Sequence, residues 1–285
     1  MASPAFESKF FETYSKTKTH YVQTGDSRGP LIICLHGLGG SVNTFKPLVP
    51  SLPKKYNVVL VDFPGFGQTS LASRTEPLSL SGHVSDVHDL ISFLQKDGKD
   101  NAKGGKVIFI GHSLGSIVAL HYAAQYSSSV AGLALLGVGR SASHIQAVRQ
   151  RMLDVAESTR KNGIQFTAAN SAPNNFPPQD QRTVPVEFIE QVRKAIAASE
   201  PEGYARTCEL IVDPSHVDPD YSKITCPVVF VAGDLDIISP LQRAESVSKE
   251  LGGPSRVEVV KSGHQPLIDA TEATTGAILK LLEKV

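Results

Sequence analysis

The chain has no net charge, no long apolar run and no leader-like segment in its 285 residues. Lys plus Arg and Asp plus Glu each total 28, so the protein has no overall field that would attract nucleic acid or an anionic membrane. No stretch approaches the roughly 20 apolar residues that a membrane helix needs. Residues 1–7 lack the basic and then apolar pattern of a signal peptide. We therefore expect no nucleic-acid partner and no membrane partner, and the sequence leaves the oligomeric state open.

Tryptophan is absent and cysteine is scarce. Cys34 lies inside an apolar run and Cys226 directly precedes another, which is typical of small core residues. With Cys208 they make an odd number, so we expect no disulfide framework and a reducing, cytoplasmic location. No His, Cys and carboxylate cluster has the spacing of a zinc site, and His83 and His88 are expected on a solvated helix surface. No metal or other cofactor is predicted.

Short apolar runs rich in β-branched residues recur along the chain, each followed by a Gly- or Asp-rich turn. Their nearly continuous apolarity predicts strands that are covered on both faces. These runs are residues 31–35, 58–61, 107–110, 133–136, 228–232 and 256–260. Helical patterns lie between several of them, at residues 80–94 and 113–126, and another closes the chain at 273–282. The alternation predicts an α/β fold with a mostly parallel central sheet flanked by helices.

This alternation breaks between residues 139 and 222, which contain no convincing strand. Helical patterns cover residues 147–160 and 185–199, and a Pro/Asn-rich segment lies between them at 172–178. We predict a helical cap at 139–222, inserted into a core made of residues 1–138 and 223–285. Ordinary crossover helices with a long loop are the alternative, although a structureless loop of that length would be unusual. After the cap, Ser239 is predicted to cap a helix with Pro240 first and Gln242 closing a capping box.

The pentapeptide at residues 111–115, Gly-His-Ser-Leu-Gly, follows an apolar run directly and opens a helical pattern. A Gly-x-Ser-x-Gly sequence between a strand and a helix is typical of a nucleophilic serine on a strained turn. The flanking glycines leave space around that turn, and the helix N-terminus favours negative charge beside it. Ser113 is therefore the candidate nucleophile, with a non-catalytic glycine-rich turn as the alternative.

A serine nucleophile needs a histidine base and an acid that orients the base. In this strand–turn–helix arrangement the base follows the serine, and the candidates are His121, His144, His216 and His264. His121 lies on the nucleophile's own helix, and His144 and His216 lie in the predicted cap. His264 directly follows the last predicted strand, so we expect it at the sheet edge from which the serine emerges.

Two aspartates follow the strand at residues 228–232 and could orient that base. Asp236 is preferred because a loop residue three positions past Gly233 can turn back towards the histidine. Asp234 is interpreted as a turn residue that bonds its own backbone.

A glycine-rich segment, His-Gly-Leu-Gly-Gly at residues 36–40, closes the first predicted parallel strand. Glycines let backbone N–H groups approach a ligand oxygen, so the N–H groups of Leu38 and Leu114 are the candidate oxyanion hole. A phosphate-binding loop is the alternative, but the spacing is not Gly-x-Gly-x-x-Gly and no Walker lysine follows. A further Gly/Pro turn at residues 62–67 is interpreted as structural, with Phe66 as a pocket wall.

In order along the chain, these blocks resemble the signatures of the α/β-hydrolase superfamily: residues 36–37, 62–67, 111–115, 233–236 and 263–264. The resemblance implies that fold, a triad and an oxyanion hole made of the candidates above. More narrowly, residues 202–208 and 224–227 look like the corresponding parts of 3-oxoadipate enol-lactonases and related small-ester hydrolases. This chain lacks the tryptophan those enzymes often carry in the cap, so its aromatic wall must differ. Substrate contacts are expected at His36, Gly37, His112, Phe66 and Arg140.

Together these features predict a hydrolase that cleaves a small carboxylic ester or lactone through an acyl-enzyme. Its partner would be the small-molecule substrate, and Arg140 would meet a substrate carboxylate or else be a surface residue at the cap hinge. A carbon–carbon bond hydrolase, an acyltransferase or a perhydrolase could use the same triad. A small-molecule receptor with little turnover is the alternative from a different class.

Overall fold

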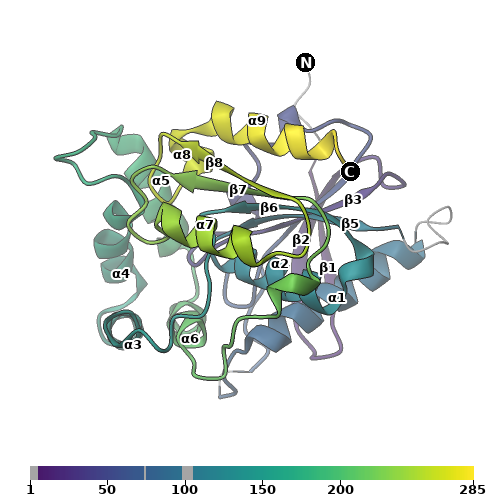
Figure 1. Cartoon of the computed structure of the whole chain (residues 1–285). Coiled ribbons are helices and arrows are strands. Elements are labelled where there is room, and N and C mark those ends of the chain that lie inside the picture. Colours follow the sequence, from purple (N-terminus) through teal and green to yellow (C-terminus); the bar gives the residue numbers. More distant parts are fainter. Residues whose placement is uncertain (1–5, 74, 98–104) are drawn as a thin grey trace.

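An eight-stranded sheet forms the centre of the computed structural model, which describes residues 6–73, 75–97 and 105–285 (Figure 1). Its strand order is β1-β2-β4-β3-β5-β6-β7-β8. β2 pairs antiparallel with β1 and β4, and all other neighbours are parallel. The strands are β1 Glu7–Glu12, β2 Lys18–Gly25, β3 Leu31–Leu35, β4 Asn57–Val61, β5 Val107–His112, β6 Val130–Leu136, β7 Val228–Gly233 and β8 Ser255–Val260. The mostly parallel sheet predicted from the apolar runs is confirmed.

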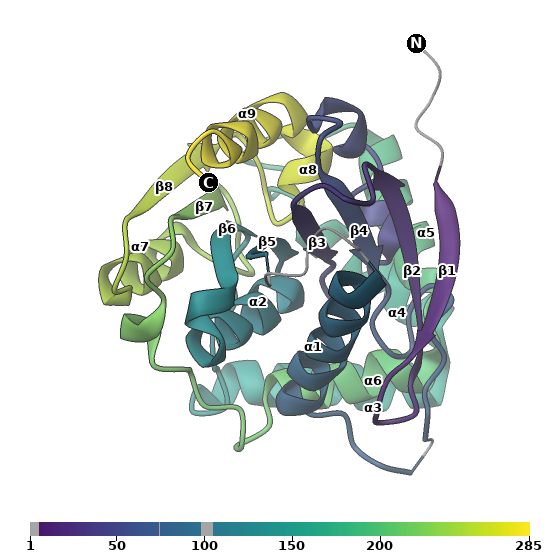
Figure 2. The ribbon, with the colours of Figure 1, turned by 90° about the vertical axis from the view of Figure 1, so that its right-hand side faces the viewer.

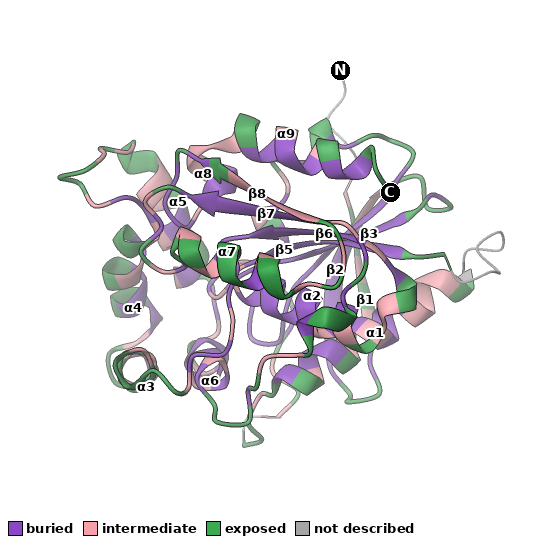
Figure 3. Ribbon diagram, viewed as in Figure 1, coloured by how far each residue is buried: buried purple, intermediate pink, exposed green. Residues whose placement is uncertain are grey.

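Both faces of this sheet are covered, as the continuous apolar strands predicted. Along β3, Ile33 and Leu35 belong to one buried cluster while Ile32 and Cys34 belong to the other, because alternate side chains point to opposite faces. α1, α2 and α7 pack on the first face, and α9 packs on the second (Figures 1 and 2). These helices are α1 Leu80–Asp97, α2 Leu114–Gln125, α7 Leu241–Glu250 and α9 Thr271–Leu282, with the short α8 Pro266–Asp269 before the last. Figure 3 shows the central strands buried within this layered arrangement.

The chain between β6 and β7 is helical, and residues 137–227, all of which the structure describes, contain no strand. Four α-helices occupy it: α3 Gln146–Asn162, α4 Ile164–Ser171, α5 Val186–Ala197 and α6 Pro201–Ile211. They gather at one end of the sheet, beyond the carboxyl ends of the parallel strands (Figure 1). Short 3-10 turns complete the fold at Val42–Thr44, Val49–Ser51, Ser127–Ser129, Pro173–Asn175 and Tyr221–Lys223. The division into a core and a cap at residues 139–222 stays a prediction.

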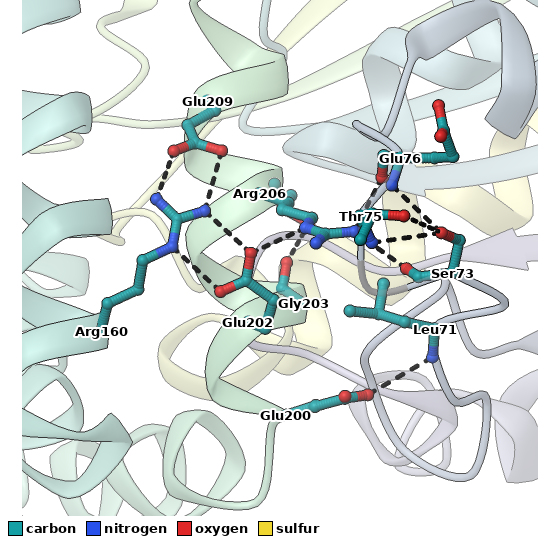
Figure 4. A network of polar contacts seen from close by, with 11 residues as sticks. Leu71, Ser73, Thr75, Glu76, Arg160, Glu200, Glu202, Gly203, Arg206 and Glu209 are labelled. Carbon is teal, nitrogen blue, oxygen red and sulfur yellow. Dashed lines mark hydrogen bonds and ion pairs between the residues drawn. The ribbon is translucent and has the colours of Figure 1, made fainter.

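An arginine–glutamate network ties these helices to each other and to the loop after β4 (Figure 4). Arg160 of α3 bonds both Glu202 and Glu209 of α6 through its guanidinium. Arg206 of α6 is almost fully buried and donates to the backbone carbonyls of Ser73 and Glu76 at 2.9 and 2.7 Å. Planar guanidinium groups suit such forked contacts, so the network fixes α6 against α3 and against the loop after β4.

Three local features differ from the sequence-based expectations. The antiparallel strands β1 and β2 at the sheet edge were not predicted. α7 begins at Leu241 after Pro240, and Ser239 makes no capping hydrogen bond, so the predicted capping box is wrong. The backbone N–H of Ser239 instead bonds Asp236 at 2.7 Å. His83 is buried against the ring of Phe63 and not on a solvated surface.

Candidate active site

Ser113 occupies a strained turn between β5 and α2. Its φ is 51°, a left-handed value that is uncommon for a residue with a side chain and costs roughly 1–3 kcal/mol. A Cβ atom on Gly111 would lie 2.6 Å from the carbonyl oxygen of Gly115, and one on Gly115 would lie 1.9 Å from that of Leu35. The backbone N–H of Ser113 bonds the carbonyl of Leu136 on β6 at 2.9 Å. These contacts require glycine on both sides and hold the serine at the carboxyl end of the sheet.

His264 and Asp236 come together from loops after β8 and β7. His264 Nδ1 lies 2.8 Å from Asp236 Oδ2, and Asp236 Oδ1 accepts the backbone N–H groups of Ile238 and Ser239. Burial opposes the charge on Asp236, but the charge and hydrogen bond of His264 and the two N–H groups outweigh it and lower the carboxyl pKa. An ionised carboxylate only accepts hydrogen bonds, so Nδ1 carries a proton, and in the neutral ring Nε2 is the nitrogen with the free lone pair.

His112, directly before the serine, holds the backbone of His264. Its Nε2 donates to the carbonyl of His264 at 2.7 Å, and the two rings lie 5.0 Å apart. Burial lowers the pKa of His112 to about 3, with the nearby charge of His264 acting in the same direction. His112 therefore stays neutral and positions the base. In this conformation the Ser113 hydroxyl makes no hydrogen bond to the described part of the chain, and such bonds often form only in the substrate complex.

The glycine loop after β3 lies directly against the serine. A Cβ on Gly37 would come within 2.9 Å of the Ser113 Cβ and 2.8 Å of His112 Nδ1, so no side chain fits there. Leu38 follows on a partly exposed stretch. Leu114 is the first residue of α2, where a backbone N–H has no intrahelical acceptor. The oxyanion hole made of the Leu38 and Leu114 N–H groups stays a prediction.

His36 supports this loop from inside and does not face a ligand. It is fully buried, its Nδ1 donates to the carbonyl of Gly37 at 2.7 Å, and its Nε2 accepts the backbone N–H of Phe63 at 3.0 Å. Burial lowers its pKa, which keeps the ring neutral and this pattern fixed. Phe66 packs its edge on His36 and is equally buried. Both residues shape the site from behind.

Arg140 is drawn away from the serine by acidic neighbours. It pairs with Asp218 at 2.7 Å and with Glu250 at 3.1 Å, and its guanidinium stacks over the ring of Tyr221. Its charge is therefore already neutralised where the chain leaves β6 and enters the helical insertion. These contacts favour the alternative that Arg140 is a surface residue at the cap hinge over a contact with a substrate carboxylate.

Two residues of the helical insertion reach the active-site loops and were missed by sequence reasoning. The carbonyl of Asn175 accepts the backbone N–H of His264, and its side-chain oxygen accepts the amide of Gln265, both at 2.7 Å. Arg182 donates to both oxygens of Asp234 at 2.8 and 2.6 Å. The Pro/Asn-rich composition distinguished this segment from the helices around it. No spacing rule, however, identifies which of its residues contacts a loop 90 positions away in the sequence.

A cleft of about 890 Å³ adjoins the site on the side of the glycine loop. Gly37, Leu38 and His112 line its inner end, next to Ser113, which is not itself in the wall. α5, the β1–β2 edge, the loop at residues 39–46, the turn at Gly67 and Gln68, and the start of α8 contribute to the remaining walls. In the described ranges, no group of three or more His, Cys, Asp and Glu side chains could hold a metal ion, and no helix is long and apolar enough to cross a membrane.

Comparisons with known proteins match both the chain and its fold. The family model for the alpha/beta hydrolase fold matches residues 30–271. The chain is similar to 3-oxoadipate enol-lactonase 2 of Acinetobacter baylyi, at 22% identity over 99% of both proteins. A thermophilic esterase from Thermogutta terrifontis superposes with a TM-score of 0.83 at 24% identity, covering 98% of both chains. The enol-lactonase from Burkholderia xenovorans gives 0.80 at 22%, covering 96% of this chain and 100% of that one. The family match over most of the chain, on a mostly parallel sheet with Ser113 at a strand-to-helix turn, shows that the protein belongs to the α/β-hydrolase family.

Proposed function

We propose that this protein is a serine hydrolase that cleaves small carboxylic esters or lactones through an acyl-enzyme on Ser113. The observation that carries the proposal is the hydrogen bond between His264 Nδ1 and Asp236 Oδ2 behind a strained Ser113. In the neutral tautomer that this bond favours, Nε2 is the nitrogen without a proton, which is the state a general base needs. The similarity to esterases and an enol-lactonase supports a hydrolase and directs attention to this substrate class.

In the proposed reaction Ser113 Oγ attacks the carbonyl carbon while His264 Nε2 takes its proton. The backbone N–H groups of Leu38 and Leu114 bind the oxyanion of the tetrahedral intermediate. The imidazolium, held by Asp236, then protonates the leaving alkoxide as the carbon–oxygen bond breaks. Water attacks the acyl-enzyme in the same way, with His264 first as base and then as acid. The helices at residues 139–222 act as the cap, and the α5 side of the cleft admits the acyl or alcohol part.

The proposal is tested by labelling the folded protein with a fluorophosphonate and mapping the modified peptide. The label should fall on Ser113 in the tryptic peptide of residues 107–140, and Ser113→Ala should remove it from that peptide. Hydrolysis of short-chain p-nitrophenyl esters and of enol-lactones then compares the two substrate types by kcat/KM. A folded protein whose Ser113 stays unlabelled refutes the nucleophile, and single stoichiometric release without a steady state refutes the hydrolase.

A cytoplasmic location is part of the same proposal. The three cysteines are buried and unpaired in this structure, as is usual for a chain kept in a reducing compartment. Fractionation of cells that produce the protein tests this directly. Recovery from the secreted fraction would contradict it.

A further inference from the structure

A second Ser–His–Asp array lies at the β1–β2 edge of the sheet, away from Ser113. Ser8 Oγ is 2.8 Å from His20 Nε2, and His20 Nδ1 is 2.6 Å from Asp62 Oδ2. His20 is 0% exposed and Asp62 is 1% exposed, whereas Ser8 on the edge strand is open to solvent. A buried acid and base thus lead outward to an accessible hydroxyl.

The direction of each hydrogen bond follows from the charge on Asp62. Burial opposes that charge, but hydrogen bonds from His20 and from the N–H groups of Gln68 and Val42 lower the carboxyl pKa. As an acceptor, ionised Asp62 requires a proton on His20 Nδ1, and in the neutral ring Nε2 is then the nitrogen that accepts the hydroxyl of Ser8. This is the hydrogen-bond polarity by which a histidine activates a serine nucleophile.

The ring of His20 is held firmly in this position. Its own backbone N–H bonds the hydroxyl of Thr69 at 2.8 Å, and Phe10 packs on the ring at 5.1 Å between centroids. Ser8 is set opposite Val22 by the antiparallel register of β1 and β2. The serine and the base therefore belong to paired strands and do not depend on a loop.

The array opens onto the cleft that reaches the active site. Ser8, His20 and Asp62 line the same walls as Gly37 and Leu38. An ester that enters the cleft can therefore reach Ser8, and it also meets residues that flank Ser113.

We propose that Ser8 is a second nucleophile, acylated by activated acyl donors such as aryl esters. Ser8 Oγ forms the bond to the acyl carbon while its proton passes to His20 Nε2. The ester carbon–oxygen bond breaks, and the aryloxide leaves with the electron pair. The N–H groups of Val42 and Gln68 beside the array are already donated to Asp62. Without those donors for an oxyanion, the reaction needs a good leaving group.

The first test uses the Ser113→Ala protein, so that acylation at Ser8 is independent of the proposed hydrolase activity. After exposure to p-nitrophenyl acetate, fragmentation of the tryptic peptide of residues 1–9 should place the acetyl group on Ser8. The rate should exceed that of the exposed Ser128 by at least about tenfold, and the Ser113→Ala/Ser8→Ala double variant should lose the label. Acetylation of Ser8 no faster than Ser128 would overturn the proposal and leave Ser8 as a mere hydrogen-bond partner of His20.

The second test compares two exposed positions first, and the buried base is changed only in its last step. Ser8→Cys places a thiol beside His20, which should take its proton and speed alkylation by iodoacetamide at least about tenfold over Ser128→Cys. The natural cysteines are buried, which keeps the background low. Adding His20→Gln to Ser8→Cys should abolish the difference. Equal alkylation of the Ser8→Cys and Ser128→Cys thiols would refute activation by His20.

Discussion

The loop after β7 carries two carboxylates, of which one bonds the ring of His264. Asp236 bonds its ring, while Asp234 bonds Arg182 and the backbone N–H of Ser262. The two aspartates are alike in sequence context, and only their partners differ. They therefore form a matched pair for testing the orienting role of the acid.

Asp236→Asn is expected to lower kcat by about 10⁴-fold near neutral pH. An amide can donate to His264 Nδ1, which would move the ring proton to Nε2 and block its use as a base. Asp234→Asn should change kcat by less than about threefold, because it weakens a partly exposed ion pair. Steady-state hydrolysis of a p-nitrophenyl ester measures both. Equal losses in the two variants would contradict the assignment.

At the scale of elements, α6 sits on the core through a contact between two glycines. A Cβ on Gly203 of α6 would lie 2.4 Å from the Cα of Gly65, in the turn after β4. Nearby, the N–H of Glu200 bonds the carbonyl of Gly65 at 2.9 Å. Gly276 of α9 offers a control within a helix, because a Cβ there meets nothing within 4 Å.

Gly203→Ala is expected to destabilise the protein by roughly 1–3 kcal/mol, because two backbones must separate. Gly276→Ala should instead stabilise it by about 0.5–1 kcal/mol, since alanine is the better helix former and the space is free. Urea unfolding of both variants gives the two free energies. A Gly203→Ala protein as stable as the Gly276→Ala protein would show that the backbones of Gly203 and Gly65 are not in close contact.

For the molecule as a whole, buried neutral histidines make stability depend on pH. Burial lowers the pKa of His83 from 6.5 to about 4. Burial also lowers the pKa of His112. Between about pH 6.5 and 4 the unfolded chain binds protons that the native state does not, so stability falls as pH falls through this window.

His83→Leu should make that pH dependence shallower by up to about 1.4 kcal/mol per pH unit, the contribution of one proton. Urea unfolding at about pH 7.5 gives the packing cost of the change alone, and repeats at about pH 6 and 5 give the slope. His83 lies outside the proposed catalytic groups, so turnover near neutral pH serves as a check that the variant is folded. An unchanged slope would refute the link to His83.

Local patterns along the chain determined much of this protein. Continuous apolar runs predicted the parallel strands, since strands covered on both faces need apolar side chains in succession. The parallel sheet then brings strand ends to one edge, which is why Ser113, Asp236 and His264 could be chosen from their places after strands. Residues 111–115 also set the turn, because only glycine fits against Gly115 and Leu35.

Long-range packing decided the rest. β1 and β2 were not predicted because an edge hairpin lacks the continuous apolar signal. The array of Ser8, His20 and Asp62 depends on the pairing of these two strands, so it was not predicted either. The contact of Asn175 with His264 and the burial of His83 depend on which helix faces which neighbour. Such contacts join residues far apart in sequence, and no local spacing encodes them. The sequence by itself determined which serine is strained, whereas the tertiary structure decided what surrounds it.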